Sequence, residues 1–229
     1  MTLDQAVRAT EVMMALAFLQ QSAEHFVSER RERALFIPRF GLSLLLLSGL
    51  ANGLALAGLM LIGLLMLRRF QGPYNGGSDR MSLLILTCLT LVHFLPAVHW
   101  KETAFGYLGF QLVLSYFISG WVKVVNPDWR SGRALCDVFR FSAYPVSEAL
   151  RGWADWPRLM FVMSWGVMGF ELAFPATLLH PALLIAGLVV AACFHFSNAL
   201  CFGLNRFFWI WLCAYPSIIW LQQRLFTGA

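Results

Sequence analysis

The sequence A-F-G-Y-L-G-F-Q-L-V-L-S-Y-F-I-S-G-W-V-K-V, residues 104–124, decides the fold class of this chain. It carries one charge, on Lys123, close to its end. As an α-helix it would be about 31 Å long at 1.5 Å per residue, which matches a hydrocarbon core of about 30 Å. The stretch therefore predicts a helix that crosses a lipid bilayer.

The composition of the whole chain agrees with insertion into a bilayer. Hydrophobic residues make up 59% of the 229 residues and charged residues only 13%, about half the charged share of a soluble domain. A soluble fold of this size has too little interior for so much apolar surface. We exclude a disordered chain, a nucleic-acid-binding module and an ordinary cytosolic enzyme, and expect an all-α, polytopic helical bundle with the lipid bilayer as its surroundings.

Similar apolar stretches recur along the chain. Residues 35–70 would form one helix of about 54 Å, which is too long for a single crossing. Ser48-Gly49 and Asn52-Gly53 predict a bend that divides this run into two short helices. We expect about six or seven spans, depending on whether the bent pair crosses once or twice. The predicted spans are 36–50, 53–69, 82–99, 104–124, 159–179, 182–202 and 205–223.

Residues 1–34 are predicted to lie outside the transmembrane domain, which covers residues 35–225. A helix is expected over 3–33, but polar side chains interrupt its apolar run and could not face lipid. These side chains are Glu11, Gln20, Gln21, Glu24 and His25. The pattern predicts an amphipathic helix on the cytoplasmic membrane surface, with the basic cluster at 30–33 near lipid headgroups.

Basic residues gather on one side of the predicted bundle if residues 35–70 cross twice. The regions on this side are residues 28–39, 68–80, 126–158 and Arg206. An excess of Lys and Arg marks cytoplasmic loops. We therefore expect a cytoplasmic N-terminus, and a long loop over 126–156 that lies on the membrane surface.

Several polar side chains lie inside the predicted spans, where lipid does not solvate them. Glu171 is expected either to form a hydrogen bond that packs helices or to serve as a site carboxylate. The same two alternatives, a packing hydrogen bond or a site role, apply to His93. They also apply to His195 and Asn198, which lie one turn apart. Idealised helices place Glu171 and His195 about 8 Å apart in depth, so contact between them needs a tilt. No spacing typical of a metal site links these residues, and no metal is predicted.

Lys123 allows two interpretations. A lysine at a helix end often extends its ammonium group to the lipid headgroups. A lysine kept from water can instead act as a base. Gly120, one turn earlier, would let another helix or a ligand approach closely.

Three stretches resemble one family in the order in which they occur. Residues 76–79 (GGSD) with Leu95-Pro96 resemble its GGD…P segment, with a serine inserted. Residues 116–123 (YFISGWVK) and 128–135 (DWRSGRAL) resemble its YFxxGxxK…DWxxGxAL signature. Residues 170–175 (FELAFP) and Phe194-His195 resemble its C-terminal part. The family is the horizontally transferred transmembrane (HTTM) domain, which includes the membrane part of vitamin K-dependent γ-carboxylase, and the resemblance covers about residues 35–225.

The resemblance implies a chemistry. The carboxylase oxidises a reduced quinone with O₂, and the strong base formed removes a proton from a peptide glutamate, to which carbon dioxide adds. Lys123 corresponds to the family's lysine that deprotonates the hydroquinone. Glu171 and His195 also match the family pattern and are the further candidate catalytic residues. The candidate ligand-binding residues are His93, Tyr116, Gly120 and Asn198.

The chain also departs from the carboxylase. At 229 residues it is short, like many bacterial members, and we expect no counterpart of the large lumenal domain that binds propeptide and substrate. The expected location is a bacterial inner membrane. Two hypotheses follow. The protein is either a membrane enzyme that binds a reduced quinone or lipid-like molecule between its spans, or a non-catalytic partner of a peptide-modifying, export or redox system. A transporter is less favoured, because matching broken helices in two halves are missing.

Overall fold

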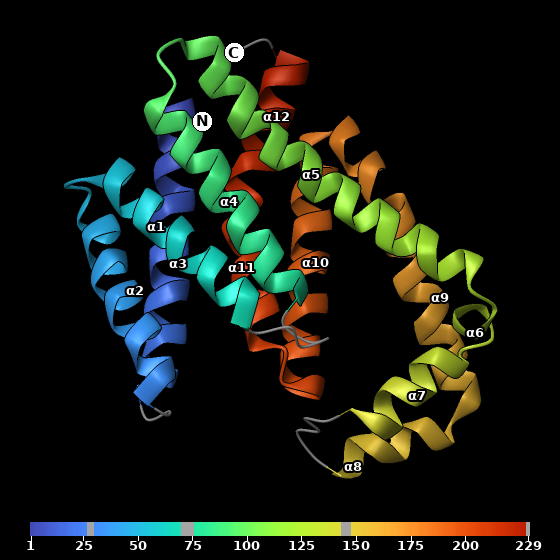
Figure 1. Ribbon diagram of the computed structural model, residues 1–229. Coiled ribbons are helices and arrows are strands. Elements are labelled where there is room, and N and C mark those ends of the chain that lie inside the picture. The colour runs from blue at the N-terminus through green and yellow to red at the C-terminus, as the bar shows by residue number, and fades with distance from the viewer. Residues whose placement is uncertain (27–29, 70–75, 143–147, 228–229) are drawn as a thin grey trace. The chain divides into compact units, whose positions relative to one another are not determined.

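Figure 1 shows a computed structural model of the chain, which describes residues 1–26, 30–69, 76–142 and 148–227. Every regular element in these ranges is a helix, so the expected all-α fold is confirmed. The chain divides into two compact units. Unit 1 comprises Met1–Phe110 and Arg206–Ala229, and unit 2 comprises Gln111–Asn205.

Unit 1 is built from helices that pack in succession. Helix α1 packs on α2 and α12, α2 on α3, and α3 on α4; Figure 1 shows α1 to α4 running up and down beside one another. The start of α5 also belongs to this unit. The bounds are α1 (Leu3–Glu24), α2 (Arg30–Ser48), α3 (Asn52–Arg69), α4 (Gly76–Phe94), α5 (Val98–Val125), α11 (Asn205–Cys213) and α12 (Tyr215–Thr227).

The N-terminal helix differs from the expectation. The helix predicted over 3–33 ends at Glu24, and Arg30 already begins α2. The prediction that Glu11 and Gln21 lie on an amphipathic helix at the membrane surface is wrong for these two side chains, because both are buried in the protein. Thr2 caps the start of α1 and forms a capping box with Gln5, which fixes where this helix begins.

The bend within residues 35–70 is confirmed. Helix α2 ends at Ser48 and α3 begins at Asn52. Gly49 between them has a φ of 80°, a left-handed conformation that glycine adopts without steric cost. Two other predicted boundaries are wrong. The span predicted over 82–99 ends at Phe94, and the last predicted span is divided into α11 and α12.

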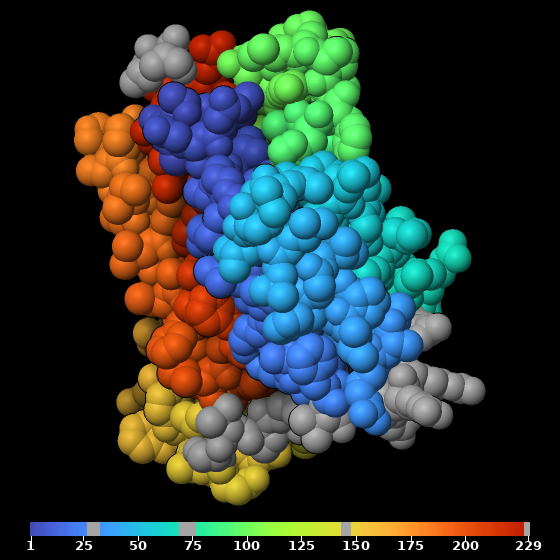
Figure 2. All heavy atoms as spheres, turned by 90° about the vertical axis from the view of Figure 1, so that its left-hand side faces the viewer, coloured from blue at the N-terminus to red at the C-terminus, as the bar shows by residue number. Residues whose placement is uncertain are grey.

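Three helical segments are long and apolar enough to cross a membrane, and a shorter apolar helix accompanies them. The long segments are Val98–Val125, Pro157–Leu179 and Pro181–Phe202, and the shorter one is Asn52–Arg68. Figure 2 shows a face of unit 1 formed by α1, α2 and α3. Large apolar side chains of α2 and α3 are exposed, among them Ile37, Leu54 and Leu61. Such an outer surface suits lipid better than water.

Unit 2 contains the rest of α5 and a helical connection to two long helices. The predicted surface loop over 126–156 is largely helical in the described residues. Leu135 and Phe139 pack against Ala154 and Met160 and join this connection to the following helix. The bounds are α6 (Pro127–Arg130), α7 (Arg133–Phe141), α8 (Glu148–Arg151), η1 (Gly152–Asp155), α9 (Pro157–Ala173), η2 (Phe174–Leu179) and α10 (Pro181–Phe202).

Candidate functional site

An ion pair joins α5 to α9 in unit 2. Nζ of Lys123 donates hydrogen bonds to both carboxylate oxygens of Glu171, at 2.8 and 2.7 Å. The exposed fraction is 19% for the Lys123 side chain and 4% for that of Glu171. Lys123 is thus held by a carboxylate inside the protein, and Glu171 has the partner on another helix that its position in a span requires.

Close approach of the two helices makes this pairing possible. Gly120 lies one turn before Lys123 on α5. A Cβ atom on Gly120 would lie 2.9 Å from the backbone nitrogen of Leu172 and 2.9 Å from Cβ of Glu171. Any larger residue would push α9 away from α5. The predicted role of Gly120 in close approach is therefore seen between two helices of the protein.

The turn of α6 covers the lysine. Nζ of Lys123 lies 5.4 Å from the centre of the Trp129 ring, within the range of a cation–π interaction. The Ser164 hydroxyl donates to the carbonyl oxygen of Trp129 at 2.6 Å, and the Trp165 indole donates to that of Arg130 at 3.1 Å. These two bonds fix α6 against α9. Sequence reasoning missed Ser164 and Trp165, since nothing in their spacing marks the contact.

A second polar pair lies in the same unit. The Tyr116 hydroxyl and Nε2 of His195 are 2.9 Å apart, and both residues are buried. The Tyr116 ring also lies 4.1 Å, centre to centre, from that of Phe174. Phe170, next to Glu171 in the chain, packs edge-on against Tyr116. The two polar pairs therefore follow one another along α5, with Tyr116 two turns before Lys123.

Two of the sequence candidates do not join these pairs. The Asn198 side chain is half-buried and has no hydrogen-bond partner in the part of the chain that the structure describes. His93 belongs to unit 1, where its Nε2 lies 2.5 Å from a carboxylate oxygen of Glu11. Glu171 bonds to Lys123, and His195 bonds to Tyr116. Both partners lie on α5, two turns apart, which agrees with the expected difference in depth between Glu171 and His195.

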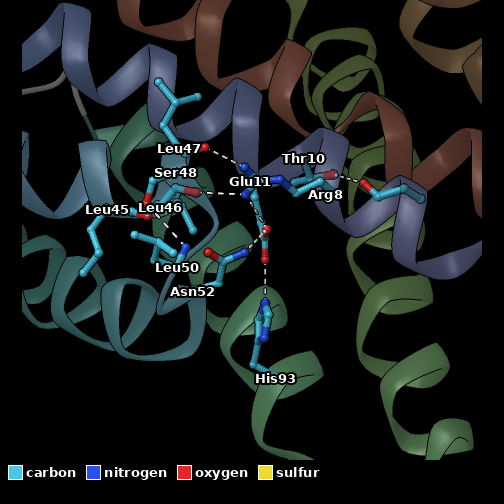
Figure 3. Close-up of polar contacts among 11 residues, drawn as sticks. Arg8, Thr10, Glu11, Leu45, Leu46, Leu47, Ser48, Leu50, Asn52 and His93 are labelled. Atoms are coloured by element: carbon cyan, nitrogen blue, oxygen red, sulfur yellow. Dashed lines mark hydrogen bonds and ion pairs between the residues drawn. The ribbon is translucent and has the colours of Figure 1, made fainter.

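Glu11 is the centre of a polar cluster that sequence reasoning missed. Figure 3 shows Arg8, Asn52 and His93 directed toward its carboxylate. Arg8 donates at 3.1 Å and Asn52 at 2.6 Å to the same oxygen. Arg8 also donates to the carbonyl oxygens of Leu46 and Leu47, which end α2. The cluster ties four helices together.

A polar pocket of about 640 Å³ lies beside α7 in unit 2. Its walls include two arginines and two aspartates, namely Arg133, Arg140, Asp137 and Asp155. Gly132 at its rim has a φ of 80°, and a Cβ there would lie 2.8 Å from the backbone nitrogen of Phe161. Among the residues described, no three His, Cys, Asp or Glu side chains are grouped as a metal ion would need.

The site residues of unit 2 fall inside the match to a protein family. A family model described as the HTTM domain matches residues 96–222, more than half of the chain. The chain belongs to the HTTM domain family. The resemblance noted in the sequence is thereby confirmed over residues 96–222, whereas residues 35–95, which include the GGSD stretch at 76–79, lie outside the match. Neither the curated proteins nor the solved structures contain a match to this chain.

Proposed function

We propose that this HTTM-domain membrane protein binds a quinone-like or lipid-like molecule in unit 2 and that Lys123 acts on it as a base. The observation that carries the proposal is the partly buried Lys123–Glu171 pair, placed two turns along α5 from the Tyr116–His195 pair. Functional pockets in membrane proteins are mostly apolar, with a few convergent polar groups. Ionisable residues inside membrane helices are functional candidates by default.

The pair can supply a base if one proton moves within it. As an ammonium, Lys123 has no lone pair and cannot accept a proton. Transfer of its proton to Glu171, across a hydrogen bond of 2.7 Å, leaves an amine beside a neutral carboxylic acid. The amine then takes the hydroxyl proton of a reduced quinone. The products are an ammonium and a hydroquinone anion, whose charges attract each other.

The remaining candidates have supporting roles in this proposal. Tyr116 and His195 would bind a ligand oxygen by hydrogen bonds, and Gly120 would keep Glu171 within reach of Lys123. His93 and Asn198 lie apart from the two pairs and receive no role at the reacting atoms. We further propose a bacterial inner membrane location with a cytoplasmic N-terminus, supported by the gathering of basic residues on one side of the spans.

The test combines ligand identification with a direct measure of proton transfer. Native mass spectrometry of the protein in nanodiscs, with lipid extraction of the same sample, should find a quinone-sized molecule near unit occupancy. Without oxygen, a short-chain reduced naphthoquinone added to the protein should then show the longer-wavelength absorbance of its anion. Lys123→Met should abolish that absorbance, since methionine cannot accept the proton.

The chain offers a matched control for this substitution. Lys101 and Lys123 are its two lysines, and both lie on α5. Lys101→Met should leave the anion signal unchanged, and circular dichroism should show that both variants fold. An empty protein with bulk lipid alone, or equal signals from the two variants, would overturn the proposal.

A second candidate function is that of a non-catalytic membrane partner for a peptide-modifying, export or redox system. Its support is that Lys123 is bonded to both oxygens of Glu171 and covered by Trp129, an arrangement that also suits a structural anchor. The polar pocket beside α7 would then receive part of the partner. Purification in mild detergent should recover a stoichiometric partner that Arg133→Gln releases and Lys101→Met retains. A clean monomer would contradict this function.

A further inference from the structure

A second group of buried charges lies in unit 1, away from the Glu11 cluster. Arg39 of α2 is 5% exposed. Its Nη2 donates to Oε1 of Gln21 on α1 at 3.0 Å, and its guanidinium lies 3.8 Å from the centre of the Phe18 ring. A charge this deeply buried normally has an ionic partner. Here a neutral amide and an aromatic ring take that place.

Two hydrogen-bond donors of this group are unused. Nη1 of Arg39 and Nε2 of Gln21 are both buried, and neither has a partner among residues 1–26, 30–69, 76–142 and 148–227. Gln21 itself is 3% exposed. Buried polar groups without partners are rare, and each calls for an explanation such as a bound ion. Both donors belong to side chains joined by a hydrogen bond, so they are near one another.

Further charges surround these donors. Arg206 of α11 and Asp79 of α4 both lie close enough for their charges to act on Arg39, but no ion pair joins Asp79 to either arginine in the described chain. Arg206 shares a short hydrogen bond with His25. The group thus holds two guanidinium cations and one carboxylate. Burial raises the pKa of Asp79, although the charges of Arg206 and Arg39 oppose this. The raised pKa lessens the negative charge of Asp79.

The position of the group favours a ligand from the membrane interface. Gln21 lies near the end of α1, Asp79 in the first turn of α4, and Arg206 at the start of α11. Helix ends of a membrane bundle lie near lipid headgroups. Helix N-termini also favour anions, because their backbone N–H groups are unpaired.

We propose that Arg39, Gln21 and Arg206 form a binding site for a phosphate group in unit 1. One phosphate oxygen accepts hydrogen bonds from Nη1 of Arg39 and Nε2 of Gln21. Arg206 adds positive charge, and Asp79 limits the affinity by repulsion. A lipid headgroup and a free phosphate ion share this chemistry. The site is independent of Lys123 and of the function proposed for unit 2.

The experiment measures binding by the full-length protein after delipidation in dodecyl maltoside. The probes are dihexanoylphosphatidylglycerol, inorganic phosphate, and dihexanoylglycerol as the chain-matched lipid without phosphate. Thermal unfolding and native mass spectrometry report binding. We expect stabilisation by the phosphatidylglycerol and none by the diglyceride. Stabilisation by inorganic phosphate as well would identify the free ion as sufficient, and its absence would identify the headgroup of a lipid as the ligand.

Variants assign the binding to this group. Arg39→Gln should weaken phosphatidylglycerol binding by about tenfold or more, since it removes a charged donor. Arg68→Gln, an exposed arginine of α3, should change it by less than about twofold. If Arg39→Gln does not fold, Gln21→Leu should still weaken binding by about two- to tenfold.

Asp79→Asn separates this proposal from a purely structural role. At a pH above the folded pKa of Asp79, it removes the competing negative charge and should strengthen phosphatidylglycerol binding several-fold. If Asp79 instead served only as an internal counter-charge for Arg39, the variant would lose stability without gaining affinity. That result would overturn the site, as would equal shifts by the diglyceride and the phosphatidylglycerol, or no shift with any probe.

Discussion

The two units each bury a glutamate in a different way. In unit 1, the carboxylate of Glu11 is hydrogen-bonded to Arg8 on its own helix, to Asn52 on α3 and to His93 on α4. In unit 2, both oxygens of Glu171 bond to one group, the ammonium of Lys123. The Glu11 carboxylate therefore joins side chains of three helices, α1, α3 and α4, whereas Glu171 pairs with one side chain.

This difference separates a cluster that joins several helices from a pair that joins two. The donors to Glu11 also cap α2, through the bonds of Arg8 to Leu46 and Leu47. Removing Glu11 therefore disturbs several elements at once. Removing Lys123 disturbs its ion pair with Glu171 and its contact with the Trp129 ring. We therefore expect the loss in free energy of unfolding to be larger when Glu11 is removed than when Lys123 is removed.

The largest expected effect is that of Glu11→Ala. The variant leaves Arg8, Asn52 and His93 without their shared acceptor, and loss of one partner from a buried charge pair costs about 3–5 kcal/mol. Arg8 and His93 are 38% and 31% exposed and can regain some water. We expect a loss near the lower limit, about 3 kcal/mol, in the free energy of unfolding measured with denaturant in detergent micelles.

Asp4→Ala is the matched control on the same helix. Asp4 is exposed in the first turn of α1, where a negative charge adds about 0.3–1 kcal/mol through the helix dipole. A loss below about 1 kcal/mol is expected. Equal losses for Glu11→Ala and Asp4→Ala would show that the cluster is not a tie between helices.

The next largest effect is expected when the Lys123–Glu171 pair is broken by one substitution and then replaced by two apolar residues. Lys123→Met leaves Glu171 buried without a cation and should cost about 2 kcal/mol, the range for an unsatisfied buried group. The double variant Lys123→Met with Glu171→Met removes both charges and should return to within about 1 kcal/mol of the unmodified protein. Unfolding of the four proteins of this cycle measures the coupling. Simple additivity of the two single losses would contradict the pairing.

The helices could be predicted from the sequence better than their contacts. Lipid demands long apolar helices, so composition alone located α5, α9 and α10, and glycine positions located the bend after Ser48. The short helices between α5 and α9 were predicted as a surface loop. Elements of 4 to 9 residues are too short to leave a clear periodic pattern.

The residues of the candidate site could be selected from the sequence, but the contacts between them could not be predicted. Sequence reasoning selected Glu171 and His195 because polar groups inside spans need a reason, and the family signature added Tyr116 and a role for Lys123. It did not pair Lys123 with Glu171, which lie 48 positions apart, because the pairing depends on how each helix is rotated. Glu11 was misjudged for a related reason. An interrupted apolar run indicates solvent exposure only when no neighbouring helix supplies donors.

The smallest expected effect concerns Asp79, a third carboxylate with one buried oxygen that no donor reaches within the described residues. Burial raises its pKa, although Arg206 and Arg39 oppose this. The folded protein therefore keeps the Asp79 proton to higher pH than the unfolded chain does. Its contribution to stability is complete below the unfolded pKa of about 4 and is lost as the pH rises through the folded pKa.

Asp79→Asn removes this contribution, because asparagine does not titrate. The free energy of unfolding of the variant minus that of the unmodified protein should increase with pH above about 4 and then level off once Asp79 is ionised in both states. Delipidated protein in phosphate-free buffer keeps ligand binding out of the comparison. An Asp79 that ionised with a close cation would produce the opposite slope.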